Sequence, residues 1–192
     1  ATLFDNTEYA GMEYVPRSET LFSSRLTPTV GFEWNNDHNI VLGADFLLDF
    51  GYDLKFVSDV NVEMYYRLSK PHVKVYAGIF PREAMRGLRS LLFFDRGYRY
   101  YHNRIQGLVA RYEYDADSYV EFAMDYTGRR SYDTREAFMI MSSGRKHIYG
   151  RNDVGDMHLG YDFLMGHYAK DYNPDTNDGV VDNVMLTPFI GY

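Results

Sequence analysis

The chain has 192 residues, no cysteine and a formal net charge of −7 at pH 7, and its sequence pI is near 5.3. This length suits one domain over residues 1–192, and the acidic balance argues against a nucleic-acid partner, because phosphate binding needs a basic surface. No run of about 18 apolar residues occurs, so no membrane-spanning helix is predicted. The chain contains 19 Tyr and 13 Phe, a composition that favours β-strands.

The first part of the chain shows strands in which apolar and polar positions alternate. Strands are predicted over residues 2–6, 21–34 and 39–50. In the third strand the apolar residues recur at every second position: Ile40, Leu42, Ala44, Phe46, Leu48 and Phe50. Pro28 requires an edge, a bulge or a bend within the second strand, because proline cannot donate to a sheet ladder.

The clearest signal is an antiparallel hairpin over residues 59–79, interrupted by a turn that contains Pro71. Its apolar positions are Val60, Val62, Met64, Tyr66, Leu68, Val73, Val75, Ala77 and Ile79. Its opposite face carries Glu63, Arg67 and Lys74. A charged face behind a continuous apolar face fits a sheet that separates hydrocarbon from a polar interior.

Five further strands are predicted over residues 104–114, 118–126, 135–143, 157–168 and 183–192. Long connections follow the first, third, fifth, seventh and ninth strands, whereas short connections follow the second, fourth and sixth. Outer-membrane barrels have this alternation of long outer loops and short periplasmic turns. The predicted fold class is therefore all-β, a transmembrane up-and-down antiparallel β-barrel with about ten strands in this chain.

The polar positions of these strands predict a charged network that faces the barrel lumen. Both signs occur, which suits an interior of interlocking ion pairs. The predicted members are Arg25, Glu33, Asp45, Asp49, Glu63, Arg67, Lys74, Arg111, Glu113, Glu121, Asp125 and Asp162. The alternative is a soluble β-barrel, in which the apolar face turns inward and encloses a lipophilic ligand.

Several segments resemble outer-membrane β-barrel proteins of the Bacteroidota type, which are porin-like. The segments that carry this resemblance are LFSSRLTPTVGFEW, HNIVLGADFLLDFG and REAFMIMSSGR. The resemblance implies the outer membrane of a Gram-negative bacterium, with outer-membrane lipids and other outer-membrane proteins as partners. Barrels of that group are often larger, so residues 1–192 can also be the first part of a longer barrel.

The long connection over residues 82–103 combines arginines with apolar residues. Its arginines are Arg82, Arg86, Arg89, Arg96 and Arg99. One interpretation is a loop that folds into the barrel or over its mouth and binds anionic solutes or lipid headgroups through guanidinium groups. The other is an outer loop with a solvated basic side and a small apolar core.

A second polar connection has alternate oxygen-bearing side chains, as in a calcium loop. The candidate ligands are Asp171, Asn173, Asp175, Asn177 and Asp182. Thr176 stands where such a loop has glycine, so a turn-rich outer loop is the competing interpretation. The sequence therefore predicts no cofactor, with calcium as the one candidate that this spacing offers.

The sequence shows no catalytic motif of the GxSxG or HExxH kind. His158 and Asp162 share a strand face, but four residues along a strand span about 13 Å, which is too far for a hydrogen bond. The predicted function is therefore non-enzymatic: a porin-like channel or an accessory subunit of an outer-membrane complex. A lipid-modifying enzyme with its site at the barrel rim is the lesser alternative.

Overall fold

A computed structural model describes residues 2–5, 20–51, 57–87, 94, 96–149, 157–170 and 179–192. The chain divides into two compact units. Unit 1 contains residues 1–31 and 41–63, and unit 2 contains residues 32–40 and 64–192. The described residues of both units are almost entirely strands.

The elements follow one another along the chain as a series of strands. The strands are β1 (Thr2–Asp5), β2 (Thr20–Leu26), β3 (Thr29–Trp34), β4 (His38–Asp49), β5 (Asp59–Ser69), β6 (Val73–Pro81), β7 (Arg104–Glu113), β8 (Tyr119–Gly128), β9 (Ala137–Tyr149), β10 (Met157–Tyr168) and β11 (Val181–Gly191). The helices are η1 (Arg82–Ala84) and α1 (Arg96–Tyr101). In the described ranges, neither helix has the length and apolar character needed to span a membrane.

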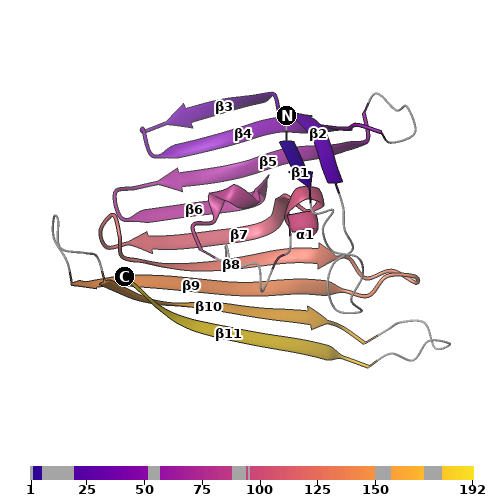
Figure 1. The fold of residues 1–192 in the computed structure, drawn as a ribbon. Coiled ribbons are helices and arrows are strands. Elements are labelled where there is room, and N and C mark those ends of the chain that lie inside the picture. The colour runs from indigo at the N-terminus through magenta and orange to yellow at the C-terminus, as the bar shows by residue number, and fades with distance from the viewer. Residues whose placement is uncertain are drawn as a thin grey trace. The chain divides into compact units, whose positions relative to one another are not determined.

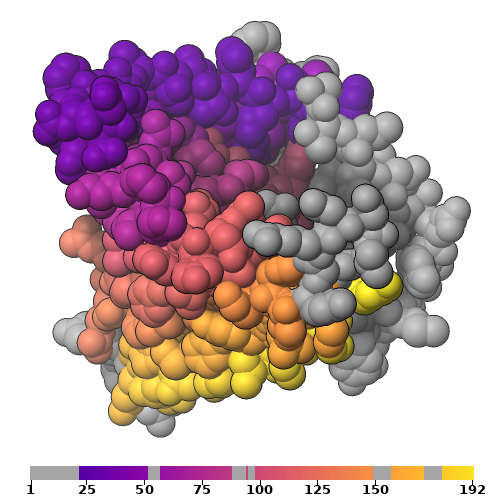
Figure 2. Space-filling view, turned by 90° about the vertical axis from the view of Figure 1, so that its left-hand side faces the viewer, coloured from indigo at the N-terminus to yellow at the C-terminus, as the bar shows by residue number. Residues whose placement is uncertain are grey.

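In unit 2 each strand from β6 to β11 pairs antiparallel with the strand that precedes it (Figure 1). The same strands appear as successive colour bands from magenta to yellow in Figure 2. This meander confirms the predicted all-β, up-and-down antiparallel fold, and its topology fits an up-and-down barrel.

In unit 1, β2 pairs with β1 and β4. The strand predicted over residues 21–34 is divided at Thr27–Pro28 into β2 and β3, which raises the number of strands among the described residues to eleven. The reason is that Pro28 has no N–H to donate; its carbonyl instead accepts the amide of Ala44 at 3.2 Å. The strand predicted over residues 135–143 is longer than expected, because β9 continues to Tyr149.

In the unit 2 sheet the buried face carries charged side chains and the exposed face carries apolar ones, the reverse of a sheet in a water-soluble protein. On β8, Glu121 and Asp125 are 1% and 2% exposed, whereas Phe122 and Met124 are 43% and 37% exposed. The same outward apolar face includes Leu108, Val120, Leu159, Val184, Leu186 and Ile190, all of which are exposed. A continuous exposed apolar face marks contact with another apolar phase, and it is the reverse of what the soluble-barrel alternative requires.

The inner face of unit 2 holds a small apolar core. Its members are Phe80, Met85, Phe94, Ile105, Val109, Ala123, Met141 and Leu164. Met85 and Phe94 come from the 82–103 connection, so the described parts of this connection pack against the inner face of the sheet, where α1 also lies (Figure 1). The interpretation in which this loop folds inward is consistent with that packing.

Glu121 ties the inward segment to the sheet. Its carboxylate accepts a hydrogen bond from Nη1 of Arg111 at 2.9 Å and hydrogen bonds from the backbone amides of Arg86 and Gly87 at 3.0–3.1 Å. Gly87 must be a glycine for this approach, since a Cβ there would lie 1.6 Å from Oγ of Ser143. A buried carboxylate with three donors is satisfied, and through it the amides of Arg86 and Gly87 are bonded to β8.

We expect Glu121→Ala to destabilise the fold strongly, because it removes the buried carboxylate that pairs with Arg111 and accepts the backbone amides of Arg86 and Gly87. Removing one partner of a buried ion pair costs about 3–5 kcal/mol. Denaturant titration of the folded protein measures the loss, and limited proteolysis should show earlier cleavage within residues 82–103. Glu33→Ala, which removes an exposed carboxylate, is the control; equal losses in the two variants would contradict this role of Glu121.

The outward face predicts a depth-dependent response to charge. Met124→Arg, in the middle of β8, should destabilise the protein folded in lipid vesicles by about 2–4 kcal/mol. Val120→Arg, near the end of the same strand, should destabilise it by about 0–1 kcal/mol. Both positions lie on the same face, so the two variants differ only in how deep the charge lies in the membrane. Small and equal effects would show that this face does not contact hydrocarbon.

Candidate functional site

A histidine–carboxylate pair joins the last two strands of unit 2. Nδ1 of His167 on β10 lies 2.6 Å from Oδ1 of Asp182 on β11, and the two side chains are 23% and 52% exposed. The residues are directly paired in the antiparallel register. The meander therefore brings together two groups that are 15 residues apart in the sequence.

The pair lies at one end of the strands. In unit 2, residues 82–103, 129–136 and 169–180 connect strands at this edge, which we call the loop edge. The short connections at residues 70–72 and 114–118 lie at the opposite edge, the turn edge. β10 ends and β11 begins at the loop edge, close to His167 and Asp182.

The pair belongs to the outward, apolar face. Leu164 packs in the inner core, and successive side chains of a strand alternate between faces, so His167 points outward. On β11, Val184 and Leu186 share the face of Asp182 and are 62% and 63% exposed. The pair thus combines a polar dyad with an apolar surface.

Phe138 on β9 holds the imidazole in place from the other side. It is paired with His167 in the register, and the two rings stack with centroids 4.6 Å apart and an interplanar angle of 28°. Because an ionised carboxylate only accepts hydrogen bonds, Nδ1 is the donor to Asp182. The other ring nitrogen, Nε2, is then the basic atom, which is the arrangement of a histidine general base oriented by an acid.

The strand neighbours of His167 on this face are apolar or acidic. They are Met165 on β10, Phe138 and Ile140 on β9, and Asp182 and Val184 on β11. None of these five side chains carries a hydroxyl or a thiol. The residue two positions further along, Ala169, has none either.

Basic residues also lie at the loop edge. Arg135 donates from Nε to the carbonyl of Ala169 at 2.8 Å and from Nη2 to the carbonyl of Gly179, so it bridges the two ends of the 169–180 connection. Arg129 and Lys170 are exposed at the same edge. Positive charge at this edge favours an anionic ligand, although the net charge of the chain is negative.

Other histidines make different contacts. Nδ1 of His38 lies 2.6 Å from the hydroxyl of Tyr66, Nδ1 of His72 lies 2.8 Å from the carbonyl of Glu113, and Nδ1 of His158 lies 3.2 Å from Nη2 of Arg145. None of these contacts supplies a carboxylate. His167 is therefore the better candidate for acid–base chemistry.

The predicted lumen network is partly assembled on the inner face. Arg111 bonds Glu121 and also Glu113, with Nε of Arg111 2.8 Å from that carboxylate. In unit 1, Arg25 bonds the buried Asp45 at 2.8 Å. Of the remaining members, Glu63 and Asp125 are buried, Asp49, Arg67, Lys74 and Asp162 are half-buried, and Glu33 is exposed.

Two arginines of the 82–103 connection are engaged with carboxylates. Nη2 of Arg82 lies 2.6 Å from Asp125, and Nη1 of Arg86 lies 3.7 Å from Glu113. Arg99 is exposed on α1, while Arg89 and the side chain of Arg96 lie outside the described residues. Anion binding by this segment stays a prediction.

The calcium hypothesis falls mostly outside the described residues, which exclude Asp171, Asn173, Asp175 and Asn177. Its fifth member, Asp182, bonds His167. In the ranges that the structure describes, no group of three or more His, Cys, Asp or Glu is placed to hold a metal ion. Calcium binding stays a prediction.

Sequence reasoning missed the His167–Asp182 pair because it compared residues along one strand rather than across two. A usable signal was present: His167 is near the end of the predicted 157–168 strand, and Asp182 immediately precedes the predicted 183–192 strand. Antiparallel pairing of consecutive strands brings such positions face to face.

One family model matches the chain over residues 1–186, and its description is lipid A 3'-O-deacylase-type. Among curated proteins, none matches the chain. The match overturns two predictions made from the sequence. The porin-like or accessory function was wrong, and so was the prediction that the protein is not an enzyme, because the matched family is named for a lipid-modifying activity. With almost its whole length matched, the chain belongs to the lipid A 3'-O-deacylase-type family.

Proposed function

We propose that this protein hydrolyses an acyl ester of lipid A in the outer membrane, with His167 as the general base and Asp182 as the residue that orients it. The observation that carries the proposal is the 2.6 Å contact between these side chains on the outward apolar face. Family membership supplies the reaction class. The lesser alternative, a lipid-modifying enzyme with its site at the rim, is the interpretation that we retain.

The position of the dyad supports a membrane lipid as the substrate. In the proposed arrangement the meander closes into a barrel that crosses the outer membrane, with the long connections on the outside. The loop edge then lies in the outer leaflet, where lipid A resides. An acyl ester can reach His167 along the apolar face without leaving the bilayer.

Water is the nucleophile in the proposed reaction, because none of the strand neighbours of His167 on its face offers a hydroxyl or a thiol. Nε2 of His167 takes a proton from water as the oxygen attacks the acyl carbonyl carbon. Asp182 stabilises the imidazolium through Nδ1. The imidazolium then returns the proton to the sugar oxygen as the ester bond breaks, and a fatty acid and a sugar hydroxyl are released.

The basic residues at the loop edge support recognition of an anionic lipid. Lipid A carries phosphate groups on its sugars, and Arg129 and Lys170 are exposed in two of the connections at the loop edge. Phosphate contacts at these residues would hold the sugar at the membrane surface while the acyl ester lies at the apolar face.

We expect His167→Gln and Asp182→Asn each to lower kcat for deacylation, by about 10²–10⁴-fold for the histidine. Mass spectrometry of lipid A after incubation in mixed micelles measures the loss of one acyl chain. His72→Gln is the matched control, since His72 contacts a backbone carbonyl at the turn edge. Unchanged activity in His167→Gln would remove this histidine from the reaction.

We expect Lys170→Gln and Arg129→Gln to raise KM several-fold with little change in kcat, because these side chains contact the headgroup and not the reacting ester. The effect should disappear with dephosphorylated lipid A as the substrate. Lys70→Gln, at the turn edge, is the control. An equal rise in KM for phosphorylated and dephosphorylated substrates would contradict phosphate recognition here.

A further inference from the structure

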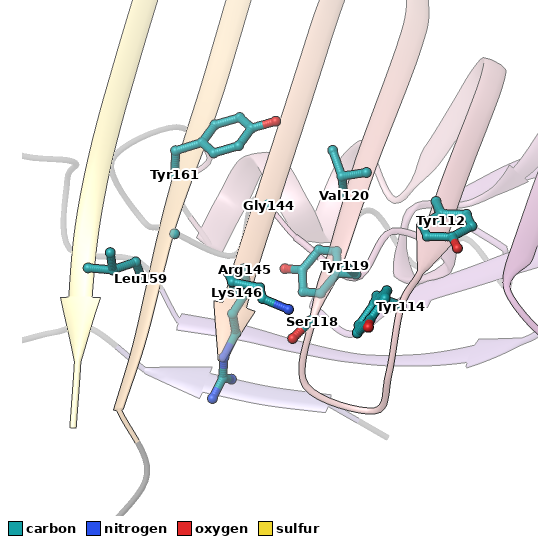
Figure 3. Close-up of a pocket in the computed structure, with 11 residues that line it drawn as sticks. Tyr112, Tyr114, Ser118, Tyr119, Val120, Gly144, Arg145, Lys146, Leu159 and Tyr161 are labelled. Carbon is teal, nitrogen blue, oxygen red and sulfur yellow. The ribbon is translucent and has the colours of Figure 1, made fainter. Parts of the chain in front are cut away.

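A groove of about 500 Å³ lies on the outward face at the turn edge, across β7 to β10 (Figure 3). It is lined mainly by aromatic and aliphatic side chains, and Tyr112, Tyr114, Val120, Lys146, Leu159 and Tyr161 bound it. Ligand sites in proteins commonly occupy about 300–1,000 Å³. The groove is therefore large enough to take a ligand rather than a single water.

Gly144 gives the groove its shape. The ring of Tyr161 lies against β9 at this glycine, where a Cβ would be 2.6 Å from Cε1 of the ring. The tyrosine hydroxyl lies 3.0 Å from Oγ of Ser142 and is held there. As Figure 3 shows, the ring and Leu159 border one side of the space and Val120 and Tyr112 the other.

Lys146 lines the groove near the turn, and Asp115 follows the lining residue Tyr114 directly in that turn. Arg145 also lines the groove, and its Nη2 lies 3.2 Å from Nδ1 of His158. Nζ of Lys146 lies 4.5 Å from the centre of the Tyr114 ring, a cation–π contact that leaves the ammonium exposed. In the adjacent turn, the carboxylate of Asp115 accepts the amides of Asp117 and Ser118. The pKa of Asp115 is lowered chiefly by the Asp117 amide, and the electrostatic influence of Lys146 adds to the effect.

We propose that this groove binds a glycerophospholipid with a zwitterionic, phosphoethanolamine-type headgroup. One acyl chain occupies the apolar groove, the phosphate contacts Lys146 and the ammonium contacts Asp115. The charge pattern selects this class, since a headgroup that is only anionic would meet Asp115 as well as Lys146. This inference uses the membrane placement of the proposed function but not its chemistry.

The groove is separate from the His167–Asp182 dyad. Phe138, which stacks on His167, and Lys146 are eight residues apart on β9, a distance of about 26 Å along a strand. The hydrocarbon core of a bilayer is about 30 Å thick. With the loop edge outside, the groove lies in the periplasmic leaflet, which is the phospholipid leaflet.

Native mass spectrometry of the full chain in a non-ionic detergent tests the proposal. The protein is offered equal amounts of phosphatidylethanolamine, phosphatidylglycerol and lipid A, and the retained lipid is identified. We expect preferential retention of phosphatidylethanolamine, and a loss of about 5-fold in Lys146→Gln, the size of one cation's contribution at a membrane surface. Val120→Trp should reduce retention by filling the groove.

Two variants serve as matched controls: Lys70→Gln removes another turn-edge lysine, and Leu186→Trp enlarges an exposed outward residue on β11. Both should retain the lipid as the unchanged protein does. Circular dichroism confirms that each variant is folded, and Lys146→Gln, which changes an exposed side chain, keeps the test independent of any folding defect in Val120→Trp.

Equal retention of the three lipids, or equal retention by test and control variants, would overturn the proposal. Preferential retention of lipid A would also overturn it, since the groove would then belong to the substrate. The His167→Gln variant separates the two hypotheses. This variant should retain phosphatidylethanolamine as well as the original protein does. If the original protein fails to deacylate lipid A, the lipid-binding result therefore still stands.

Discussion

Pairing of buried charges on the inner face is the constraint on which unit 2 depends. Glu121 and Asp125 are almost completely buried, and an unpaired carboxylate in such a place would be strongly destabilising. Arg111 and Arg82 neutralise them, and Glu121 also accepts two amides of the 82–103 connection. The inner face is thereby closed by charge pairs and a small core, so the apolar residues of the strands are left outward.

This inversion gives the outward face its functional importance. A hydrolase that acts on a membrane lipid must present its polar groups where lipid contacts the protein. The inner face of unit 2 is occupied by paired charges and a small core, so lipid does not contact the protein there. His167 and Asp182 satisfy the requirement, because they interrupt the apolar face at its loop edge while Phe138 fixes the imidazole. In the proposed reaction, the reacting groups are therefore continuous with the surface along which the acyl chains lie.

The two edges of the outward face differ in chemistry. The loop edge combines a histidine–carboxylate dyad with exposed basic residues, whereas the turn edge combines aromatic rings with Lys146 and Asp115. At the turn edge, Trp34 also stacks on His38 with ring centroids 5.2 Å apart. Aromatic residues with polar tips suit the boundary between hydrocarbon and water, so the two edges are suited to the two leaflets.

The sequence by itself determined the strands, their alternation and the up-and-down order, because a period of two and the lengths of the connections are local properties. It also placed Glu121 and Asp125 on the polar face of their strand, and both are buried in the structure. The His167–Asp182 pair was decided only by tertiary structure, since its distance depends on the register between β10 and β11. Neither the strand pattern nor the tertiary structure identified the reaction class, because alternating strands occur in channels and in enzymes alike. Family membership supplied the reaction class.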